Sequence, residues 1–227
     1  MAEWSKFNRS GGSRAELGAR SEMNSGQPIV FVVDDDAGVR EALSSLLSSA
    51  GLRVAAFASA AEFLRVQPLN SSNCLVLDLH LPDISGLDLQ QQLAEENGPP
   101  IVFISAHGDI PSSVRAMKAG AIEFLPKPFS NQELLSAIEN AIAEDREARQ
   151  SRAELAELRR SYARLSARER EVLPLIVAGL TNQHVAERLG IAKITVQVHR
   201  ARIVRKLAAQ SVAHLVRIAG KLGVCRS

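Results

Sequence analysis

The sequence predicts an α/β domain with a doubly wound, five-stranded parallel sheet, followed by a linker helix and an all-α domain of four helices. Apolar strand patterns alternate with helical patterns five times between residues 28 and 145, which favours parallel strands with helices on both faces. Residues 28–145 carry 6 Lys/Arg against 16 Asp/Glu, whereas residues 166–227 carry 11 against 3. Two domains with different partners explain this division of charge better than one domain does.

Four segments follow from these patterns. Residues 1–27 are rich in Ser, Gly, Arg and Glu and lack apolar periodicity, so we expect a disordered tail. We place the α/β domain at residues 28–145, the linker helix at residues 146–164 and the four-helix domain at residues 165–227.

Short apolar runs predict the strands of the first domain, and apolar residues that recur on one helical face predict its helices. The run Cys74–Leu77 is too short for a buried helix and is typical of a parallel strand that is buried on both faces. The predicted strands are Ile29–Val33, Leu52–Phe57, Cys74–Leu77, Ile101–Ile104 and Ala121–Leu125. The predicted helices are Val39–Ser49, Ala60–Val66, Leu87–Glu96, Pro111–Ala119 and a long helix that is capped by Asn131.

Polar residues follow four of these strands at the point where each strand ends. They are Asp34 and Asp35, Asp78, Ser105 and Lys127. The carboxyl ends of the strands in a doubly wound sheet converge on one crevice, so we expect these side chains to lie together. Three crowded carboxylates require a countercharge, and an octahedral, oxygen-binding cation such as Mg²⁺ can provide it.

This set of groups favours transfer of a phosphoryl group to a carboxylate. If Asp35 and Asp78 hold the cation, the free oxygen of Asp78 can attack a phosphorus atom while the metal neutralises the transferred group. Lys127 adds a second positive charge, and the hydroxyl of Ser105 can donate a hydrogen bond to a phosphoryl oxygen. Each residue alone also has an ordinary explanation, as a solvated loop, a surface charge or a helix cap. Their shared position at strand ends favours the functional interpretation.

Residues 166–222 are predicted to form four helices. Ser166 and Glu169 have the spacing of a capping box, Thr181 is placed to cap the second helix, and Gly190 is placed to end it. The last three helices are predicted at Asn182–Leu189, Lys193–Ala208 and Ser211–Leu222. Two helices joined by a short turn, of which the second is basic, are typical of a helix-turn-helix that binds DNA.

The linker segment is highly charged and carries a thin apolar stripe of Leu155, Leu158 and Ile142. A solvated linker helix explains this pattern. A dimeric coiled coil is the alternative, but one or two heptads are too few to choose it.

Cysteine usage and hydropathy favour a cytoplasmic protein. Cys74 and Cys225 are the only cysteines, and two isolated cysteines make neither a disulfide framework nor a metal site. No apolar stretch approaches the roughly 18 residues that are needed to span a bilayer, and the N-terminus lacks the apolar core of a signal peptide. We therefore expect no membrane partner.

The first domain resembles the receiver domain of bacterial two-component response regulators. The motifs VVDDD, LVLDLHLPDISG, ISAHGD and FLPKPF occur in the order and spacing of that family across about residues 28–145. The resemblance implies a flavodoxin-like fold, a cis peptide before Pro128 and a phosphoryl group that Asp78 accepts from a sensor histidine kinase. The implied ligands of Mg²⁺ are Asp34, Asp35, Asp78 and the backbone carbonyl of His80. The implied phosphate-sensing and switch residues are Ser105, Phe124 and Lys127.

The last domain is similar to the four-helix LuxR-type domain through LSAREREVL, GLTNQHVAERLGI and TVQVHRARIVRKL. The whole chain thus resembles the FixJ/NarL-type transcriptional regulators, and the stretch AHGDIPSSVRAMKAGAIEFLPKPF is similar to regulators of aromatic-hydrocarbon degradation. The resemblance implies double-stranded promoter DNA as a partner, a homodimer on phosphorylation, and RNA polymerase as a further candidate partner. The implied DNA-binding residues are Lys193, Thr195, Gln197, Val198, His199, Arg200, Ala201, Arg202, Arg205 and Lys206.

Three positions depart from the family pattern. Gln197 stands where the family often has Lys, and Ala201 stands where another member can carry a basic residue. Ala192 replaces the Ser that usually caps the recognition helix, which costs about 1 kcal/mol of local stability. The predicted base-contacting surface is therefore neutral: Gln197 can pair with adenine, and Val198 and Ala201 can contact a thymine methyl group.

Two other functions explain part of the pattern. A phosphohydrolase that uses Asp78 as its nucleophile would commonly carry a second Asp two residues later, where His80 stands. An interaction module that is never phosphorylated would not need the complete set of Asp34, Ser105 and Lys127. We therefore expect a phosphorylation-controlled transcription factor and not an enzyme.

Overall fold

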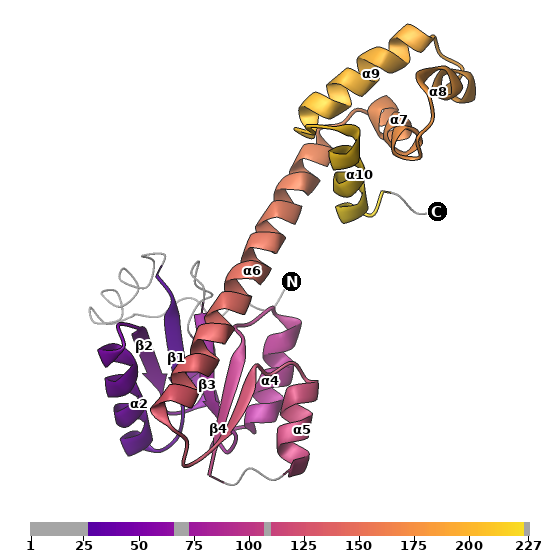
Figure 1. Cartoon of the computed structure of the whole chain (residues 1–227). Helices are drawn as coiled ribbons and strands as arrows, with labels where there is room; N and C mark the ends of the chain where they lie inside the picture. Colours follow the sequence, from indigo (N-terminus) through magenta and orange to yellow (C-terminus); the bar gives the residue numbers. More distant parts are fainter. Residues whose placement is uncertain (1–26, 66–72, 107–109, 225–227) are drawn as a thin grey trace, which may run out of the picture. The chain divides into compact units, whose positions relative to one another are not determined.

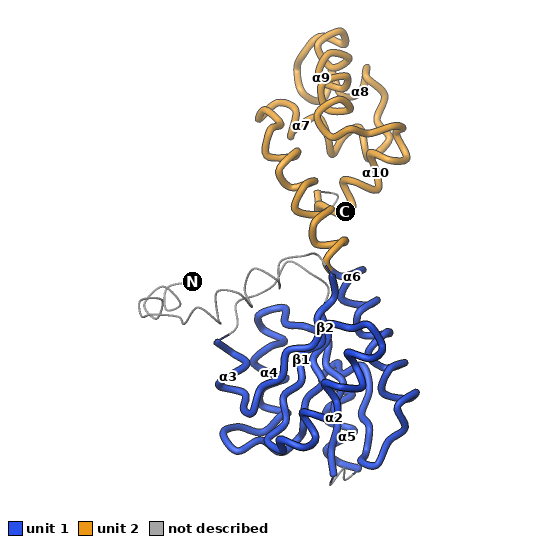
Figure 2. Tube along the Cα trace, turned by 90° about the vertical axis from the view of Figure 1, so that its left-hand side faces the viewer, with its two compact units in different colours: residues 1–148 blue, residues 149–227 orange. Residues whose placement is uncertain are grey.

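The computed structural model describes residues 27–65, 73–106 and 110–224. The predicted disordered tail lies, apart from Gln27, outside the described residues. The chain divides into two compact units, residues 1–148 and residues 149–227 (Figure 2). Among the described helices, none is long and apolar enough to cross a membrane.

The first unit contains a five-stranded parallel sheet in the order β2-β1-β3-β4-β5, which confirms the predicted doubly wound fold. The strands are β1 Ile29–Val33, β2 Arg53–Phe57, β3 Asn73–Asp78, β4 Ile101–Ser105 and β5 Glu123–Pro126. The helices are α2 Ala37–Ser49, α3 Ala60–Leu64, α4 Gly86–Glu95, α5 Ile110–Lys118 and α6 Asn131–Ala163, of which α6 continues into the second unit. The strand order reverses between β1 and β3, where sheets of this kind place their sites.

Alternate residues of the central strands face opposite sides of the sheet, and a separate core forms on each side. Phe31 and Leu75 belong to the core that α3, α4 and α5 complete, whereas Val32 and Val76 belong to the core that α2 and α6 complete. Helices α2, α4, α5 and α6 are seen around the sheet in Figure 1. Both β1 and β3 are buried along their whole length. Burial on two faces explains why these strands appear in the sequence as unbroken apolar runs.

The fifth strand and the long helix each start at a different residue from the predicted one. The fifth strand is predicted from Ala121, but the amide of Ala121 donates to the carbonyl of Ala116 (3.1 Å) and so ends α5; β5 begins at Glu123. Asn131 is predicted to cap the long helix, but Asn131 is its first helical residue. Ser130 caps it instead, because its hydroxyl accepts from the amide of Glu133 (3.2 Å) and its amide donates to the Glu133 carboxylate (2.8 Å).

The second unit is helical, as predicted. Its helices besides the end of α6 are α7 Ala167–Val177, α8 Asn182–Leu189, α9 Lys193–Lys206 and α10 Val212–Lys221. The capping box of Ser166 and Glu169 is present in full, Thr181 caps α8, and Gly190 ends it with a left-handed backbone (φ 62°). Ala192 precedes α9 and supplies no side-chain cap, as its methyl group requires. Helix α9 ends at Lys206, two residues before the predicted end.

The apolar stripe predicted along the linker packs in part against the first unit and in part against the second. Ile142 is buried in the core of the first unit beside α2. Leu158 and Tyr162 pack against the core of the second unit, and Glu154 forms an ion pair with Lys221 of α10 (3.1 Å). Two residues of the predicted stripe, Ile142 and Leu158, therefore contribute to the two cores.

Candidate functional site

The carboxyl ends of β1 and β3 bring three carboxylates together, as predicted. One oxygen from each of Asp34, Asp35 and Asp78 lies within 4.8 Å of the other two. Asp34 is fully buried, Asp78 is 8% exposed, and Asp35 is exposed at the surface. The pocket therefore combines two desolvated carboxylates with one that meets solvent.

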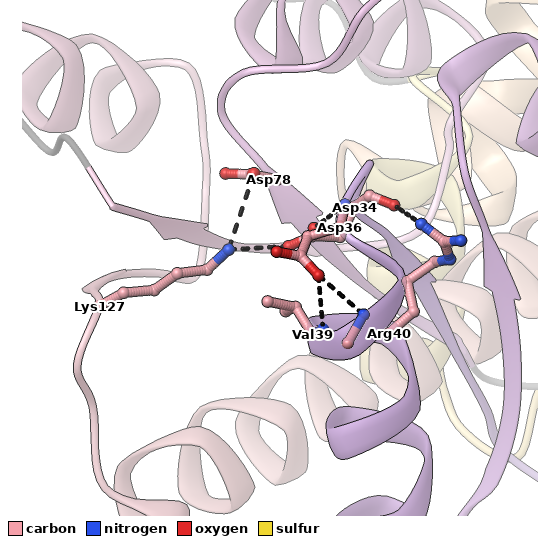
Figure 3. A network of polar contacts seen from close by, with 7 residues as sticks. Asp34, Asp36, Val39, Arg40, Asp78 and Lys127 are labelled. Carbon is pink, nitrogen blue, oxygen red and sulfur yellow. Dashed lines mark hydrogen bonds and ion pairs between the residues drawn. The ribbon is translucent and has the colours of Figure 1, made fainter.

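Lys127 extends from the loop after β5 toward these carboxylates (Figure 3). Its ammonium lies 2.8 Å from Oδ2 of Asp34 and 3.7 Å from Oδ2 of Asp78. The peptide between Lys127 and Pro128 is cis, as expected. Lys127 thus supplies the positive charge that two buried carboxylates need.

The environment of Asp78 perturbs its carboxylate. Burial raises its pKa above the ordinary value, Lys127 opposes that effect, and the neighbouring charge of Asp34 reinforces it. Oδ1 of Asp78 is buried and accepts no hydrogen bond from the described residues. An oxygen of this kind, beside further carboxylates, fits the all-oxygen donor set that hard divalent cations prefer.

Backbone contacts hold Asp34 in position. The amide of Asp36 donates to Oδ1 of Asp34 (2.8 Å), and the guanidinium of Arg40 donates to the Asp34 carbonyl (2.7 Å). The carboxylate of Asp36 then caps α2 by accepting from the amides of Gly38 and Val39 (Figure 3). The role of Arg40 is not visible in the sequence, because an arginine six residues after an aspartate belongs to no motif.

The loop after Asp78 is fixed by a close approach and by a carboxylate. A Cβ at Gly86 would lie 2.6 Å from the carbonyl oxygen of Asp78, so only glycine fits there. Asp83 accepts from the amide of Ala61 at the start of α3 (2.8 Å). Partial desolvation raises the pKa of Asp83, but backbone amides, first that of Ala61, outweigh it and hold the pKa below its usual value.

The other predicted pocket residues are Ser105 at the end of β4, Phe124 within β5 and His80 after β3. Ser105 is fully buried, and its carbonyl accepts from the amide of Lys127 (2.8 Å). Phe124 is half-buried, with its ring centroid 6.1 Å from that of Phe103. His80 is exposed and follows Asp78 in the loop. Ser105 and His80 thus lie at or just after the carboxyl ends of their strands, as the carboxylates do, whereas Phe124 lies two residues before the end of β5.

Helix α9 has one buried face and one exposed face. Val196, Ile203 and Leu207 are at most 3% exposed and pack in the core of the second unit. The exposed residues of the helix are Lys193, Ile194, Gln197, Val198, Ala201, Arg202 and Arg205. The predicted neutral surface of Gln197, Val198 and Ala201 is thus on the outside of the unit.

Four residues predicted at the DNA are half-buried: Thr195, His199, Arg200 and Lys206. Lys206 donates to the carboxylate of Glu169 (2.7 Å) and to the carbonyl of Arg164 (3.0 Å). Arg200 donates to the side chain of Asn182 in α8 (3.3 Å). Lys206 is therefore engaged inside the unit, and we leave it out of the proposed phosphate contacts.

Comparison with known proteins agrees with this division. Residues 30–139 match the response regulator receiver domain, and residues 163–219 match the bacterial regulatory proteins of the luxR family. Nodulation protein W of Bradyrhizobium diazoefficiens is 47% identical over 86% of this chain and 87% of its own. Response regulator protein TmoT of Ectopseudomonas mendocina is 45% identical over 89% of this chain and 93% of its own.

Two solved structures of regulators are also similar. The response regulator StyR is 50% identical and superposes with a TM-score of 0.77, covering 86% of this chain and 99% of its own. Full-length FixJ of B. japonicum is 38% identical, with a TM-score of 0.52 and coverage of 89% and 100%.

Proposed function

Since the chain belongs to the FixJ/NarL-type response regulators, the DNA-binding transcription factors of two-component systems, we propose that Asp78 is the residue that accepts the phosphoryl group from a sensor histidine kinase. The observation that carries the proposal is the buried Oδ1 of Asp78, which has no hydrogen-bond donor among the described residues. It lies in the pocket with Asp34, Asp35 and Lys127. An oxygen without a donor keeps its lone pairs available for attack, and the nearby positive charge of Lys127 can offset the charge of an incoming phosphoryl group.

The carboxylates of Asp34, Asp35 and Asp78 and the backbone carbonyl of His80 would hold Mg²⁺. When bound, the ion would neutralise negative charge on the transferred phosphoryl group. The clustering of the three carboxylates within 4.8 Å supports this assignment, and so does the raised pKa of Asp78, which burial causes.

In the transfer, Oδ1 of Asp78 forms a bond to phosphorus while the bond from phosphorus to the kinase histidine nitrogen breaks. Lys127 pairs with Asp34 and lies 3.7 Å from Asp78, so its ammonium is within reach of a phosphoryl oxygen. The hydroxyl of the buried Ser105 would donate to another phosphoryl oxygen. Phe124, which is packed against Phe103, would follow the movement of Ser105.

The output would be a homodimer that forms through α5 and β5. Ile110, Val114 and Met117 are 79%, 44% and 43% exposed, and their spacing places them on one face of α5. Exposed apolar residues gathered on one helix face are typical of an interaction surface. A rearrangement at Ser105 and Phe124 would reshape this surface and allow two receivers to pair with twofold symmetry.

The DNA contacts would come from the exposed face of α9. Gln197, Val198 and Ala201 would meet base edges in the major groove, and Arg202 and Arg205 would meet phosphates. Promoter DNA is the proposed partner because residues 166–227 carry 11 Lys/Arg against 3 Asp/Glu.

Labelling with a small phosphodonor tests the proposal. Incubation of the full chain with Mg²⁺ should give stable, stoichiometric labelling, and Asp78→Asn should abolish it. Asp88→Asn, which changes an exposed carboxylate on α4, should label as well as the unchanged chain. Undiminished labelling of Asp78→Asn would refute the assignment. Continuous turnover of the phosphodonor would indicate a phosphohydrolase. No labelling of the unchanged chain would indicate a receiver that is never phosphorylated.

A further inference from the structure

Helix α9 exposes a large apolar side chain that neither the core nor the sequence motifs explain. Ile194, in the first turn of the helix, is 65% exposed, and Val198 is 43% exposed. Neither side chain packs in the core that takes Val196 and Ile203 from the opposite face. Ile194 and Val198 are four residues apart and therefore lie beside one another, so the helix presents a small apolar patch on its exposed face.

We propose that Ile194 contacts a thymine methyl group in the major groove and is a further residue that determines DNA sequence preference. The inference rests on the proposed placement of α9 at DNA. The thymine methyl is the one apolar group that a base pair presents in the major groove, so it is the natural partner of an exposed aliphatic side chain.

The position of Ile194 on the helix supports this contact. Ile194, Val198 and Ala201 have the spacing i, i+4 and i+7, which places them in one row along the helix. Gln197 is exposed next to this row. In helix-turn-helix proteins the N-terminal residues of the second helix contact base edges. Ile194 lies nearer that end than Gln197, Val198 and Ala201, the three residues predicted to contact bases.

The charges around the row favour DNA over a protein or lipid partner. Lys193 precedes Ile194, and Arg202 and Arg205 are exposed toward the other end of the helix. No acidic residue lies within Lys193–Lys206. Cations at both ends of a short apolar row match a groove in which methyl groups lie between two lines of phosphates.

A cycle of protein and DNA changes tests the inference. The unchanged full-length chain is first used to enrich its preferred duplex from a random pool, and each thymine of that duplex is then replaced singly by uracil, which lacks the methyl group. Ile194→Ala should weaken binding to the preferred duplex on the order of 3- to 10-fold, as expected for a few buried methylene equivalents. On the duplex with uracil at the contacted position, Ile194→Ala and the unchanged chain should bind equally.

Controls separate the possible failures. Lys193→Ala removes a neighbouring charge and should weaken binding equally on the thymine and uracil duplexes. Ile194→Ala should melt at the same temperature as the unchanged chain, because the side chain lies outside the core. If Ile194→Ala loses nothing, or loses the same factor on every duplex, the inference is wrong. If the unchanged chain enriches no sequence, the placement of α9 in the major groove is wrong, and the inference falls with it.

Discussion

The ammonium of Lys206 lies 2.7 Å from Oε2 of Glu169, a carboxylate whose side chain is only 2% exposed. The same oxygen accepts from the amide of Ser166 (2.8 Å). One buried oxygen therefore joins the capping box at the start of α7 to the last residue of α9. This contact fixes the helix that carries the proposed DNA contacts to the rest of its unit.

Replacement of Lys206 should therefore affect stability first. We expect Lys206→Ala to lower the free energy of unfolding of the second unit by about 1–3 kcal/mol, because it leaves a buried carboxylate short of a partner. Thermal unfolding of the full chain, followed by circular dichroism, measures the loss. Arg205→Ala is the matched control, since Arg205 is exposed and should weaken DNA binding without lowering the melting temperature. Equal stability of the two variants would contradict the structural role of Lys206.

Glu169 should also make the stability of the second unit depend on pH. Burial raises the pKa of Glu169, but Lys206 and the amide of Ser166 outweigh it and hold the pKa below its usual value. A lowered pKa stabilises the fold above the unfolded pKa of about 4.3, and this contribution is lost as the pH falls through the folded pKa. Glu169→Gln should therefore lose less stability than the unchanged chain between about pH 5 and pH 3. Parallel acid-unfolding curves would rule out this contribution.

The pocket was predictable from the sequence, whereas the partners of the basic residues on α9 were not. Burial on both faces gives β1 and β3 unbroken apolar runs, so the positions of Asp34 and Asp78 at their ends are visible in the sequence. The sequence shows α9 as a basic helix but does not show which cation turns inward. Lys206 pairs with a residue 37 positions earlier, and only tertiary packing brings the two together.

Asp78 should destabilise the receiver until a cation binds. Burial raises its pKa, and Asp34 adds to the effect of burial against Lys127. A raised carboxyl pKa means that the fold loses stability as the pH rises from the unfolded pKa through the folded one. In a chelator at neutral pH, Asp78→Asn should therefore melt a few degrees higher than the unchanged chain.

With Mg²⁺ bound, the unchanged chain should melt at a higher temperature than Asp78→Asn. Mg²⁺ should raise the melting temperature of the unchanged chain and of the surface variant Asp88→Asn. It should raise the melting temperature of Asp78→Asn much less, because that variant lacks one ligand. Differential scanning fluorimetry with and without Mg²⁺ measures both effects. An equal Mg²⁺ shift in Asp78→Asn and the unchanged chain would place the cation elsewhere.

The exposed face of α5 should be required for dimerisation. Val114 is 44% exposed between Ile110 and Met117, so Val114→Asp should leave the receiver folded and able to be labelled at Asp78. It should prevent the shift from monomer to dimer that we expect phosphorylation to cause in the unchanged chain, because a charge enters an apolar contact. Light scattering gives the masses. The control variant Val216→Asp changes a 41% exposed valine of α10 and should dimerise normally. A dimer of phosphorylated Val114→Asp would exclude the α5 face as the dimer contact.

Gln197 should contribute sequence preference, and Arg202 should contribute affinity. Both are exposed on α9, but an amide can pair with the N6 and N7 edge of adenine, whereas a guanidinium without a base partner binds phosphate. Gln197→Ala should cost about 1–3 kcal/mol on the preferred duplex and little on a scrambled one. Arg202→Ala should weaken binding to both duplexes and make the affinity less dependent on salt. Titrations of both variants on both duplexes, at two salt concentrations, measure these effects. If Gln197→Ala loses the same binding free energy on both duplexes, or none on either, Gln197 carries no sequence information. The sequence preference of the protein must then come from Ile194, Val198 and Ala201.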